Sequence, residues 1–455
     1  MIKKLFRYII FITFTIIIVF TSFNYISGNG YFGFLLNFVH EDEVLKVKRI
    51  LLPYKYINDQ EKKIGELKHP YSKLELDFKN SNKNIEVAVM KDIKLNKNLI
   101  LEKYNLINGF YFGINNIFPG SGYMDFHSNN FIILSSRGTI GYSNSFNNEL
   151  FFKQIKNNIN DFIGSDQFHK NRWFSVKDLL ILENKILVSY TEEIKANCWN
   201  TSIIWAEMNY NELNFEKFFS PTNCIPKINS EGEFNAHQSG GRMINFDDNH
   251  ILFSIGDYRN RFHAQDKQSV NGKIIKINTN NYKYDIFSMG HRNPQGLYFD
   301  RNKNFIIETE HGPKGGDEIN IIHVDKFNNK EIQNFGWAIV SAGDHYGGKK
   351  KEGFEERYKK YPLHKSHKDY GFIEPLKSFV PSIGISEVTK IDQNEYVVSS
   401  LGGRAIYFFK INKNNQITNL EKIEVFERVR DLVYSNNNLY LFFEDTASIG
   451  IINIP

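Results

Sequence analysis

The sequence predicts an all-β protein, a six-bladed β-propeller preceded by an N-terminal transmembrane or signal-anchor helix. Three observations support this fold class. An unbroken apolar run follows basic residues near the start of the chain, short alternating apolar runs fill the sequence from about residue 86, and one hairpin-like unit recurs six times there. The predicted domains are an anchor or signal peptide (1–28), a stalk or small cap (29–85) and the propeller (86–455).

The first segment is typical of an export signal or a membrane anchor. Lys3, Lys4 and Arg7 precede an apolar run over residues 8–23. The basic flank would stay in the cytoplasm, so we expect the rest of the chain to be exported to the periplasmic side. As a helix the run would span roughly 24 Å, a little less than the hydrocarbon core. No A-x-A-like cleavage site follows, which favours an uncleaved anchor in the inner membrane over a cleaved signal peptide. A buried core helix is the remaining alternative, disfavoured because no polar face interrupts the run.

The composition excludes several classes of protein. Of the 455 residues, 41% are hydrophobic and 15% aromatic, with 31 Gly and 11 Pro, which excludes a disordered chain, a collagen and a miniprotein. The net charge of +5 is scattered among Asn-rich loops, so we expect no nucleic-acid partner. Cys198 and Cys224 are the 2 cysteines of the chain. In an oxidising compartment they would form a disulfide, and two buried free cysteines are the alternative.

The recurring unit is an apolar run, a polar turn of Asn and Asp, and a second apolar run that ends in a small or acidic residue. Its six copies begin at Tyr123, Val176, Gly241, Asn293, Ile385 and Val429. A single hairpin cannot bury both of its faces, so the copies must pack on one another, and a ring of four-stranded sheets also removes long exposed edges. The six near-equivalent units therefore predict a six-bladed propeller. A two-sheet sandwich of similar hairpins is the alternative.

The longest gap between copies contains the charged, Gly-containing segment 344–370, which we expect to be a surface excursion. Within it, His364 and His367 have a spacing that suits a metal site. They lie among Lys and Tyr without Cys or carboxylate partners at ligand spacing, which predicts a solvated face instead.

In a propeller, ligands bind at one mouth of the central channel, beside the start of each inner strand and the end of the next. Three polar, Gly-rich segments fall at such places. The first, 235–242, enters the third hairpin, and Gly256 and Asp257 follow at the end of that hairpin. The second is 290–296, and the third is 310–318. Together they would bring a His, an Arg and an Asp to one axis, as a base, a fixed cation and an orienting carboxylate.

These segments resemble the glucose/sorbosone dehydrogenase family, soluble quinoprotein sugar dehydrogenases that bind pyrroloquinoline quinone (PQQ) and calcium on a six-bladed propeller. The similar blocks are HQSGGRM with the trailing IGD, GHRNPQGL, EHGPKGGDEIN and NFGWA, in the family's order. The resemblance covers about residues 86–455 and is densest over 235–340.

The resemblance implies a role for each matched residue. His237 matches the base that removes the proton of the sugar C1 hydroxyl while a hydride passes to the quinone. Arg292 would stabilise charge on the reduced quinone, and the resemblance assigns the remaining roles as follows: cofactor contacts to Asn293, Arg428, Arg430, His311 and Ser382, a sugar-hydroxyl contact to Asp257, support behind the site to Asp317, and calcium-binding carbonyls to Gly312 and Pro313.

Three positions depart from the family pattern. The family's quinone-contacting lysine corresponds to Gly402, a tryptophan before its Pro-Thr-Val block corresponds to Val380, and a glutamine of the calcium loop is His311. A cation and an aromatic face are therefore missing from the implied cofactor pocket.

Three functions compete on these residues. The first is a PQQ- and calcium-dependent enzyme that oxidises an aldose at C1 to a lactone and passes electrons to a membrane quinone or a cytochrome. The second is a propeller without cofactor that binds a carbohydrate or a protein, favoured by Gly402 and Val380. The third, a calcium-dependent lactone hydrolase, would need carboxylate and Asn side chains around the metal, where the calcium loop offers mainly carbonyls.

Overall fold

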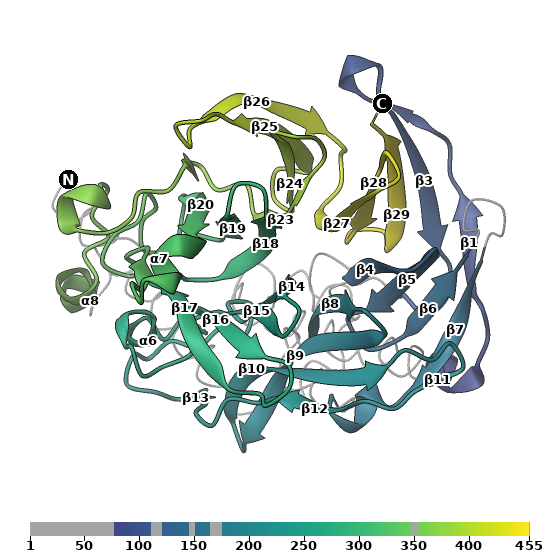
Figure 1. Cartoon of the computed structure of the whole chain (residues 1–455), viewed down its shortest axis with the longest axis horizontal. Helices are drawn as coiled ribbons and strands as arrows, with labels where there is room; N and C mark the ends of the chain where they lie inside the picture. Colours follow the sequence, from purple (N-terminus) through teal and green to yellow (C-terminus); the bar gives the residue numbers. More distant parts are fainter. Residues whose placement is uncertain (1–76, 111–120, 145–150, 164–174, 347–353, 455) are drawn as a thin grey trace, which may run out of the picture. The chain divides into compact units, whose positions relative to one another are not determined.

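The structure is a computed structural model that describes residues 77–110, 121–144, 151–163, 175–346 and 354–454. The predicted anchor (1–28, with its apolar run 8–23) and most of the predicted stalk lie outside the described residues. Within the described ranges, no helix is long and apolar enough to cross a membrane. All described residues belong to one compact unit, drawn in colour in Figure 1.

The described chain forms six antiparallel four-stranded blades, each built from the predicted hairpin and two further strands. In order from the inner to the outer strand, blade one contains β4 (Gly122–His127), β5 (Asn130–Ser135), β6 (Ile140–Ser143) and β7 (Phe151–Asn157); blade two contains β8 (Val176–Leu182), β9 (Lys185–Lys195), β10 (Cys198–Glu207) and β12 (Glu216–Phe219); blade three contains β14 (Gly240–Asp247), β15 (His250–Ile255), β16 (Lys273–Asn278) and β17 (Tyr284–Met289). Blade four contains β18 (Pro294–Asp300), β19 (Phe305–Glu310), β20 (Asp317–His323) and β22 (Lys377–Phe379); blade five contains β23 (Ile385–Lys390), β24 (Glu395–Ser400), β25 (Ala405–Ile411) and β26 (Ile417–Glu424); blade six contains β27 (Val429–Ser435), β28 (Asn438–Phe443), β29 (Ser448–Asn453) and β3 (Ile100–Leu106).

The remaining elements are short and join or cover the blades. They are β1 (Ile85–Val89), β2 (Ile93–Lys94), β11 (Glu212–Leu213), β13 (Ile225–Pro226), β21 (Gln333–Asn334), α6 (Phe262–Gln265), α7 (Val324–Asn328), α8 (Phe354–Lys360), and the 3-10 turns η1 (Asn96–Asn98), η3 (Ile159–Asp161) and η4 (Lys368–Tyr370).

The blades close into a ring around their first strands. Each inner strand contacts the inner strand of the next blade, in the order β4, β8, β14, β18, β23 and β27, and β27 contacts β4 again. Figure 1 shows these six strands around the centre. The all-β propeller prediction is therefore confirmed, and the two-sheet sandwich is excluded.

The ring is closed by the first described strands of the chain. β3 pairs with β29 as the outer strand of blade six, and β1 pairs with both β3 and the outer strand β7 of blade one. Phe78 and Ile85 are buried in the core between these two blades. Phe78 thus packs on the propeller although it lies before the predicted boundary at residue 85.

Six apolar cores lie between neighbouring blades, one for each contact of the ring. Successive residues of a strand point to opposite faces, so one strand supplies two cores. In β5, Ile132 and Leu134 face blade two, whereas Phe131 and Ile133 face blade six. This arrangement explains the continuous apolar runs of the repeat, because both faces of each blade are buried.

The polar turns between the two strands of each hairpin also follow from the sequence. Asn436 and Asn437, between β27 and β28, adopt φ values of 49° and 60°. Asn tolerates this left-handed conformation, and two such residues make the tight turn that suits twisted antiparallel strands.

The described parts of the segment 344–370 combine exposed residues with several buried ones, so the prediction of a surface excursion holds only in part. His345 and Tyr361 are buried, and Tyr361 packs in a small core with Trp337. His367 is only 2% exposed and forms ion pairs with Glu318 (3.5 Å) and Glu374 (3.1 Å). The prediction of a solvated face is therefore wrong for His367, because one carboxylate partner, Glu318, comes from the distant strand β20 and the other, Glu374, follows in the same loop.

The structure pairs the two cysteines, with Cys198 at the start of β10 bonded to Cys224 just before β13. The bond closes a loop with a sequence separation of 26 residues. We expect Cys198→Ser to lower the free energy of unfolding by about 3 kcal/mol, because the cross-link restricts the unfolded chain. Denaturant unfolding with and without reductant measures this; reductant should destabilise only the unsubstituted protein, and an equal response of both proteins would contradict the prediction.

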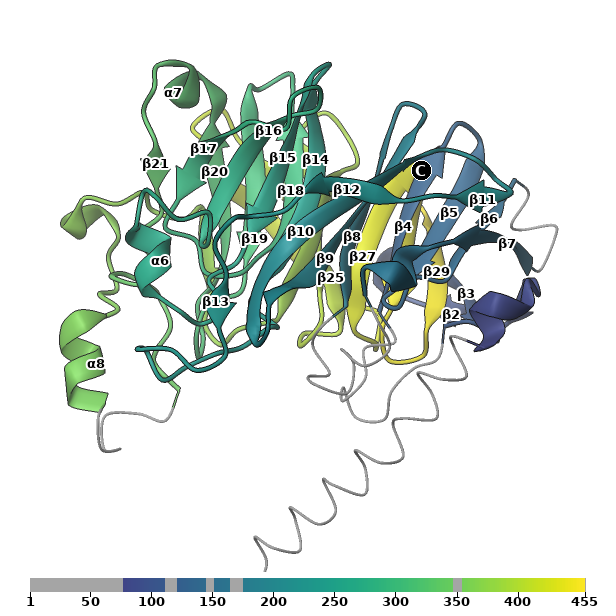
Figure 2. The same ribbon diagram turned by 90° about the horizontal axis from the view of Figure 1, so that it is seen from below.

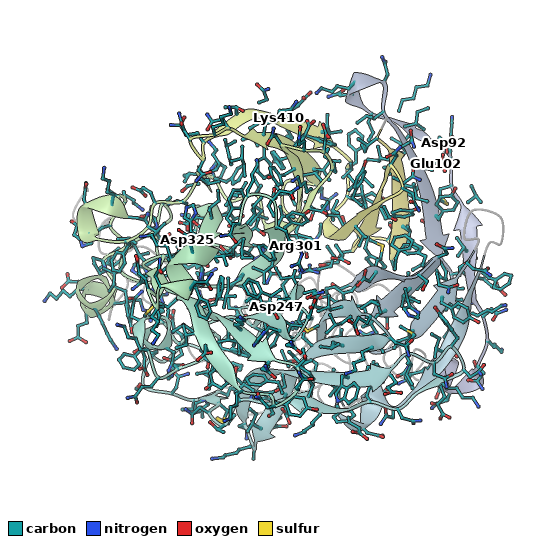
Figure 3. All side chains as sticks on the ribbon, viewed as in Figure 1. Asp92, Glu102, Asp247, Arg301, Asp325 and Lys410 are labelled. Atoms are coloured by element: carbon teal, nitrogen blue, oxygen red, sulfur yellow. A yellow bond between two sulfur atoms is a disulfide. The ribbon has the colours of Figure 1, made fainter. Side chains whose placement is uncertain are left out.

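The two faces of the ring differ. α7 lies at one face, and α8 lies toward the other (Figure 2). Arg301 and Asp247 lie near the centre of the face seen in Figure 3, at the turns that end β18 and β14. Each inner strand begins at the opposite face, so the Gly-rich segments 235–242, 290–296 and 310–318 meet there. We call that face the mouth.

Candidate active site

A buried arginine crosses the central channel beneath the mouth. Arg242 of β14 is 7% exposed, and its guanidinium binds Asp178 of β8 (2.7 Å), Asp431 of β27 (2.8 Å) and Glu387 of β23. Although burial opposes its charge, these three carboxylates raise the pKa of Arg242 well above its ordinary value. Arg242 therefore ties four blades together and forms the floor of the site.

The same acids join neighbouring blades through the backbone. Asp178 accepts a hydrogen bond from the N–H of Met243 (2.7 Å), and Asp431 accepts one from the N–H of Met124 (2.8 Å). Each bond runs from an inner strand to the next, so the floor fixes where the first residues of each strand lie.

Two adjoining cavities open above this floor. The narrower holds about 150 Å³ and the wider about 510 Å³, and His237 and His311 line both. The narrower is lined by Ser121, Tyr123, Ser175, Lys177, Ser239, Gly240, Gln295, Leu401, Arg428, Arg430 and Glu444, and the wider by Asn235, Gln238, Arg259, Arg292, Asn293, Gly312, Asp317, Tyr346, Ser382 and Gly384. Nearly all the predicted site residues are thereby brought together.

The predicted arginine pair is held by a carboxylate that the sequence analysis did not single out. Arg430 binds Glu444 through Nε (2.7 Å) and Nη2 (2.6 Å), and Arg428 Nη2 lies 3.3 Å from the same side chain. Arg430 Nη1 also donates to Gln295 (3.1 Å). Although burial opposes its charge, the two guanidiniums lower the pKa of Glu444 to about 2. Glu444 therefore orients both arginines and offsets one of their charges.

A third cation, Lys177, enters the narrower cavity from β8. Lys177 and Arg430 occupy equivalent bulges: on β8 the pairing with β9 skips Lys177, and on β27 the pairing with β28 skips Arg430. The extra residue of a β-bulge is left out of the hydrogen-bonded pairing of the two strands. Here both extra residues, Lys177 and Arg430, line the narrower cavity at the mouth. Gly241 makes room, because a Cβ at that position would collide with Lys177. Burial, followed by the nearby Arg430, lowers the pKa of Lys177 to about 7.

Arg292 arranges the segment that follows β19. Its Nη1 donates to the carbonyls of His311 (2.8 Å) and Gly312 (2.7 Å). The guanidinium also stacks on Trp337 in a cation–π contact, with the guanidinium carbon 5.4 Å from the ring centroid. Burial lowers the pKa of Arg292, and Asp257 opposes this effect. Asn293 accepts a hydrogen bond from the N–H of Gly240 (3.1 Å), so it links blades three and four at the mouth.

His311 presents an imidazole atom to the cavities. Its Nε2 is buried without a hydrogen-bond partner in the described part of the chain, whereas Nδ1 lies 3.4 Å from Asn293 Nδ2. Burial lowers the pKa of His311, which favours the neutral ring. Such a polar atom is suited to a ligand, because it gains a partner when the ligand binds.

The carbonyls assigned to calcium do not fit a cation in this arrangement. Gly312 O accepts a hydrogen bond from the Arg292 guanidinium at 2.7 Å, and Pro313 O accepts one from the exposed Ser382 at 3.4 Å. The nearby Asp317 carboxylate is fully used, since it accepts backbone N–H bonds from Gly312 (3.2 Å) and from residues 383 and 385 (3.0 Å each). Asp317 therefore holds the backbone of these two loops together behind the cavities.

Asp257 does not line either cavity. It is fully buried, and its carboxylate accepts hydrogen bonds from Trp337 Nε1 (2.7 Å) and the N–H of Arg259 (2.7 Å). The Gln238 amide, turned to satisfy both neighbours, donates to Asp257 (2.9 Å) and accepts from Arg292 (2.8 Å). Burial raises the pKa of Asp257 to about 6. The expected sugar contact is thus corrected to a positioning role behind Gln238.

His237 is exposed where the two cavities meet. Its backbone N–H donates to Asn235 Oδ1 at 2.8 Å, which fixes the loop that enters β14. A side chain at this position can reach a molecule that extends from the cation-lined cavity into the wider one.

Sequence reasoning missed Arg242, Lys177 and Glu444. The sequence did contain a sign that Lys177 belongs to the site. Residues 176–180 (VKDLL) and 429–433 (VRDLV) share one pattern, and this pattern aligns Lys177 with Arg430. Arg242 lies inside the quoted HQSGGRM block, but its role depends on carboxylates from three other blades. No local pattern reveals such a contact.

Comparison with known proteins identifies a family for the chain. The family model of Glucose / Sorbosone dehydrogenase matches residues 181–452. An uncharacterised protein of Synechocystis, slr1608, is 30% identical over 223 residues, 42% of this chain and 50% of the relative. Aldose sugar dehydrogenase YliI of Escherichia coli is 27% identical over 177 residues, 36% and 44% of the two chains. Quinoprotein glucose dehydrogenase B of Acinetobacter calcoaceticus is 31% identical over 136 residues, 23% and 27%. The chain thus spans half or less of the length of these curated relatives.

Solved structures share the fold. The soluble aldose sugar dehydrogenase of Escherichia coli in its apo form superposes with a TM-score of 0.58 at 17% identity, covering 81% of this chain and 99% of that one. The PQQ-bound aldose sugar dehydrogenase of Streptomyces coelicolor gives a TM-score of 0.54 at 15% identity, covering 82% and 98%. At these identities the likeness concerns the propeller alone.

Proposed function

Because the chain belongs to the Glucose / Sorbosone dehydrogenase family, we propose that it oxidises an aldose sugar at C1 to the lactone, with PQQ bound at the mouth. The observation that carries this proposal is one exposed imidazole, His237, placed beside a cavity lined by three cations. The family alone supports a sugar dehydrogenase; the cofactor, the position of oxidation and the role of each residue are the proposal.

The narrower cavity fits an anionic cofactor. Lys177, Arg428 and Arg430 face only one lining carboxylate, Glu444, so the cavity carries net positive charge. PQQ has three carboxylates, and guanidinium groups bind carboxylates through paired donors. The unpartnered Nε2 of His311 offers one further polar contact. Lys177 supplies a cation where the family's lysine is replaced by Gly402, so that departure does not leave the pocket without a third positive group.

The bound cofactor would supply the acceptor for the hydride of the sugar C1. The chain's own residues do the rest. His237 removes the proton of the C1 hydroxyl, because a hydride leaves readily only as the oxygen becomes anionic. Arg292 holds the carbonyls of residues 311–312 and, with Trp337, closes the site from behind. The wider cavity, with Gln238, Arg259 and Tyr346 on its walls, would hold the sugar.

Export and membrane anchoring belong to the same proposal. A disulfide is typical of an oxidising compartment, so the Cys198–Cys224 bond supports export. The anchor over residues 8–23 would hold the enzyme beside a membrane quinone or a cytochrome as electron acceptor, and this part rests on the sequence alone.

Reconstitution tests the proposed function. The full chain is incubated with PQQ, with and without Ca²⁺, and dye-linked oxidation of a panel of aldoses is measured beside equilibrium binding of PQQ. We expect PQQ-dependent oxidation of at least one aldose with the lactone as product. A well-folded protein that does not bind PQQ would contradict the proposal and leave the carbohydrate- or protein-binding propeller in its place.

The affinity for PQQ tests the third cation. We expect Lys177→Met to raise the Kd of PQQ by about 10- to 100-fold, because a hydrogen bond to a charged group contributes about 1.5–3 kcal/mol. Lys185→Met is the matched control, since Lys185 begins β9 and does not line the mouth. Titration of both variants by the absorbance or fluorescence of the cofactor measures the effect, and an unchanged Kd for Lys177→Met would remove this residue from the pocket.

A further inference from the structure

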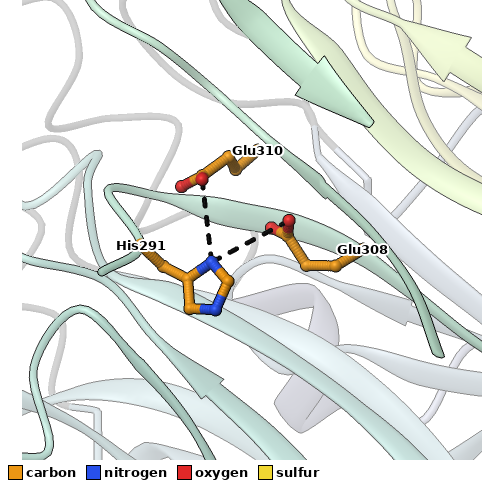
Figure 4. A group of neighbouring side chains, drawn as sticks. All are labelled: His291, Glu308 and Glu310. Atoms are coloured by element: carbon orange, nitrogen blue, oxygen red, sulfur yellow. Dashed lines mark ion pairs between the residues drawn. The ribbon is translucent and has the colours of Figure 1, made fainter. Parts of the chain in front are cut away.

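A second cluster of metal-ligating side chains lies behind the mouth. His291 precedes β18, and Glu308 and Glu310 are alternate residues of β19, so both carboxylates point to the same face of the strand. Figure 4 shows one ring nitrogen of His291 facing both carboxylates. The exposed fractions are 0% for His291, 0% for Glu308 and 3% for Glu310, so the group is closed to solvent.

The distances suit a shared cation better than a hydrogen bond. His291 Nδ1 lies 3.6 Å from Glu310 Oε1 and 3.9 Å from Glu308 Oε2, beyond the length of an N–H···O bond. Ligand atoms that bind one tetrahedral metal at about 2.1 Å are separated by roughly 3.4 Å. The three donors lie within 4.8 Å of one another, which leaves space for one ion among them.

Unpartnered buried atoms are an independent sign of a ligand. Among the described residues, His291 Nδ1 and Glu308 Oε1 have no hydrogen-bond partner although both residues are completely buried. A buried donor or acceptor without a partner costs about 1–3 kcal/mol, more if it is charged, so such atoms are rare in folded proteins. Nδ1 of His291 faces both carboxylates.

Neighbouring groups of the protein hold each of the three side chains in place. His291 Nε2 lies 2.8 Å from Ser288 Oγ, and Glu310 Oε2 accepts from the N–H of Arg292 (2.5 Å), so the facing atoms Nδ1 and Oε1 remain for a ligand. Glu308 Oε2 accepts from Asn320 (3.0 Å), which leaves Oε1 without a partner in the described part of the chain. Partners of this kind orient metal ligands and fix the histidine tautomer.

The cluster also holds two acidic side chains side by side in the interior, with one imidazole nitrogen facing them. A divalent cation would bind both carboxylates and the imidazole at once.

We propose that His291, Glu308 and Glu310 bind one divalent first-row transition ion of the Zn²⁺ type. One imidazole nitrogen and two carboxylate oxygens are ligands that such ions accept, whereas Ca²⁺ prefers oxygen alone. The site is separate from the carbonyls of Gly312 and Pro313. It would hold the segment before β18 against the end of β19, and through Glu310 it would fix the backbone of Arg292.

Metal analysis of the full chain tests this site. The metal-free protein is incubated with Zn²⁺, Co²⁺ or Ca²⁺, desalted and examined by elemental analysis, by the visible spectrum of Co²⁺ and by thermal unfolding. We expect one equivalent of Zn²⁺ or Co²⁺, with raised thermal stability. Glu308→Gln keeps the shape and should weaken binding by more than about 100-fold. Glu192→Gln, a buried glutamate of β9 paired with Lys217, is the matched control and should bind normally.

The outcomes separate the alternatives. Wild-type protein that retains no transition metal, or that is stabilised by Ca²⁺ alone, overturns the proposal, as does folded Glu308→Gln that binds Zn²⁺ as tightly as wild type. If Glu308→Gln does not fold, X-ray absorption of the zinc-loaded wild type decides. A shell of nitrogen and oxygen with one imidazole supports the site, and a shell without imidazole overturns it.

Discussion

His237→Ala is expected to lower kcat/KM for aldose oxidation by about 10²- to 10⁴-fold, the usual contribution of a positioned base. The imidazole is exposed where the two cavities meet, so its loss removes the proton acceptor without disturbing the buried floor of the site. Dye-linked kinetics of the PQQ-loaded variant measure the effect, and its Kd for PQQ should change little.

His250→Ala is the matched control for this substitution. His250 begins β15 at the turn beside Asp247, on the face opposite the mouth, and it should leave kcat/KM unchanged. A cofactor-loaded His237→Ala protein with wild-type kcat/KM would refute the proposed base. The proposed oxidation itself would then stand, because loss of the base and loss of the activity are measured separately.

The largest effect on stability is expected for Arg242→Met. The substitution leaves Asp178, Asp431 and Glu387 buried together without their common partner. Breaking a buried ion pair in this way costs about 3–5 kcal/mol. Denaturant unfolding at pH 7.5 measures the loss. Arg301→Met is the control, since Arg301 is exposed and donates to the backbone carbonyls of residues 245 and 246.

The deficit of Arg242→Met should depend on pH. Burial raises the pKa of Asp178 to about 7 and also raises those of Glu387 and Asp431, and Arg242 opposes all three shifts. An acid whose pKa is higher in the folded state stabilises the protein below its unfolded pKa, and that stability is lost as the pH rises through the folded pKa. Without Arg242 the shifts increase, so the deficit should be larger at pH 8 than at pH 5.5. An equal deficit at both values, or a loss below about 1 kcal/mol, would contradict the role given to this arginine.

The sequence was sufficient for the parts of the fold that depend on local pattern. The hairpins follow from two-residue periodicity and from Asn-rich turns such as Asn436–Asn437, and their sixfold recurrence predicts the ring. The outer strand of blade six could not be predicted, because β3 carries no copy of the repeat and its pairing with β29 joins opposite ends of the described chain. His367 was misjudged for the same reason, since Glu318 is distant in sequence.

The candidate site was predictable where it lies in short motifs. His237, Arg292, His311 and the arginine pair were placed correctly around the mouth. Asp257 is the exception. The IGD motif that contains it does not indicate that Gln238 and Trp337 hydrogen-bond to its carboxylate and separate it from the cavities. The His291 cluster was predictable only in part. The sequence shows that Glu308 and Glu310 are alternate residues of one strand, but their approach to His291 depends on how two segments pack.

The pairing of β3 with β29 has a consequence for how the protein is made. The ring cannot close until β29 has formed, so we expect intermediates that lack this strand to leave the β3 edge unpaired and the core between blades one and six incomplete. Contacts between the ends of a chain slow folding, and an open strand edge is a template for association with other chains. A chain shortened by one strand at its C-terminus would therefore lose its closure as well as one strand, and such fragments should aggregate rather than form a five-bladed protein.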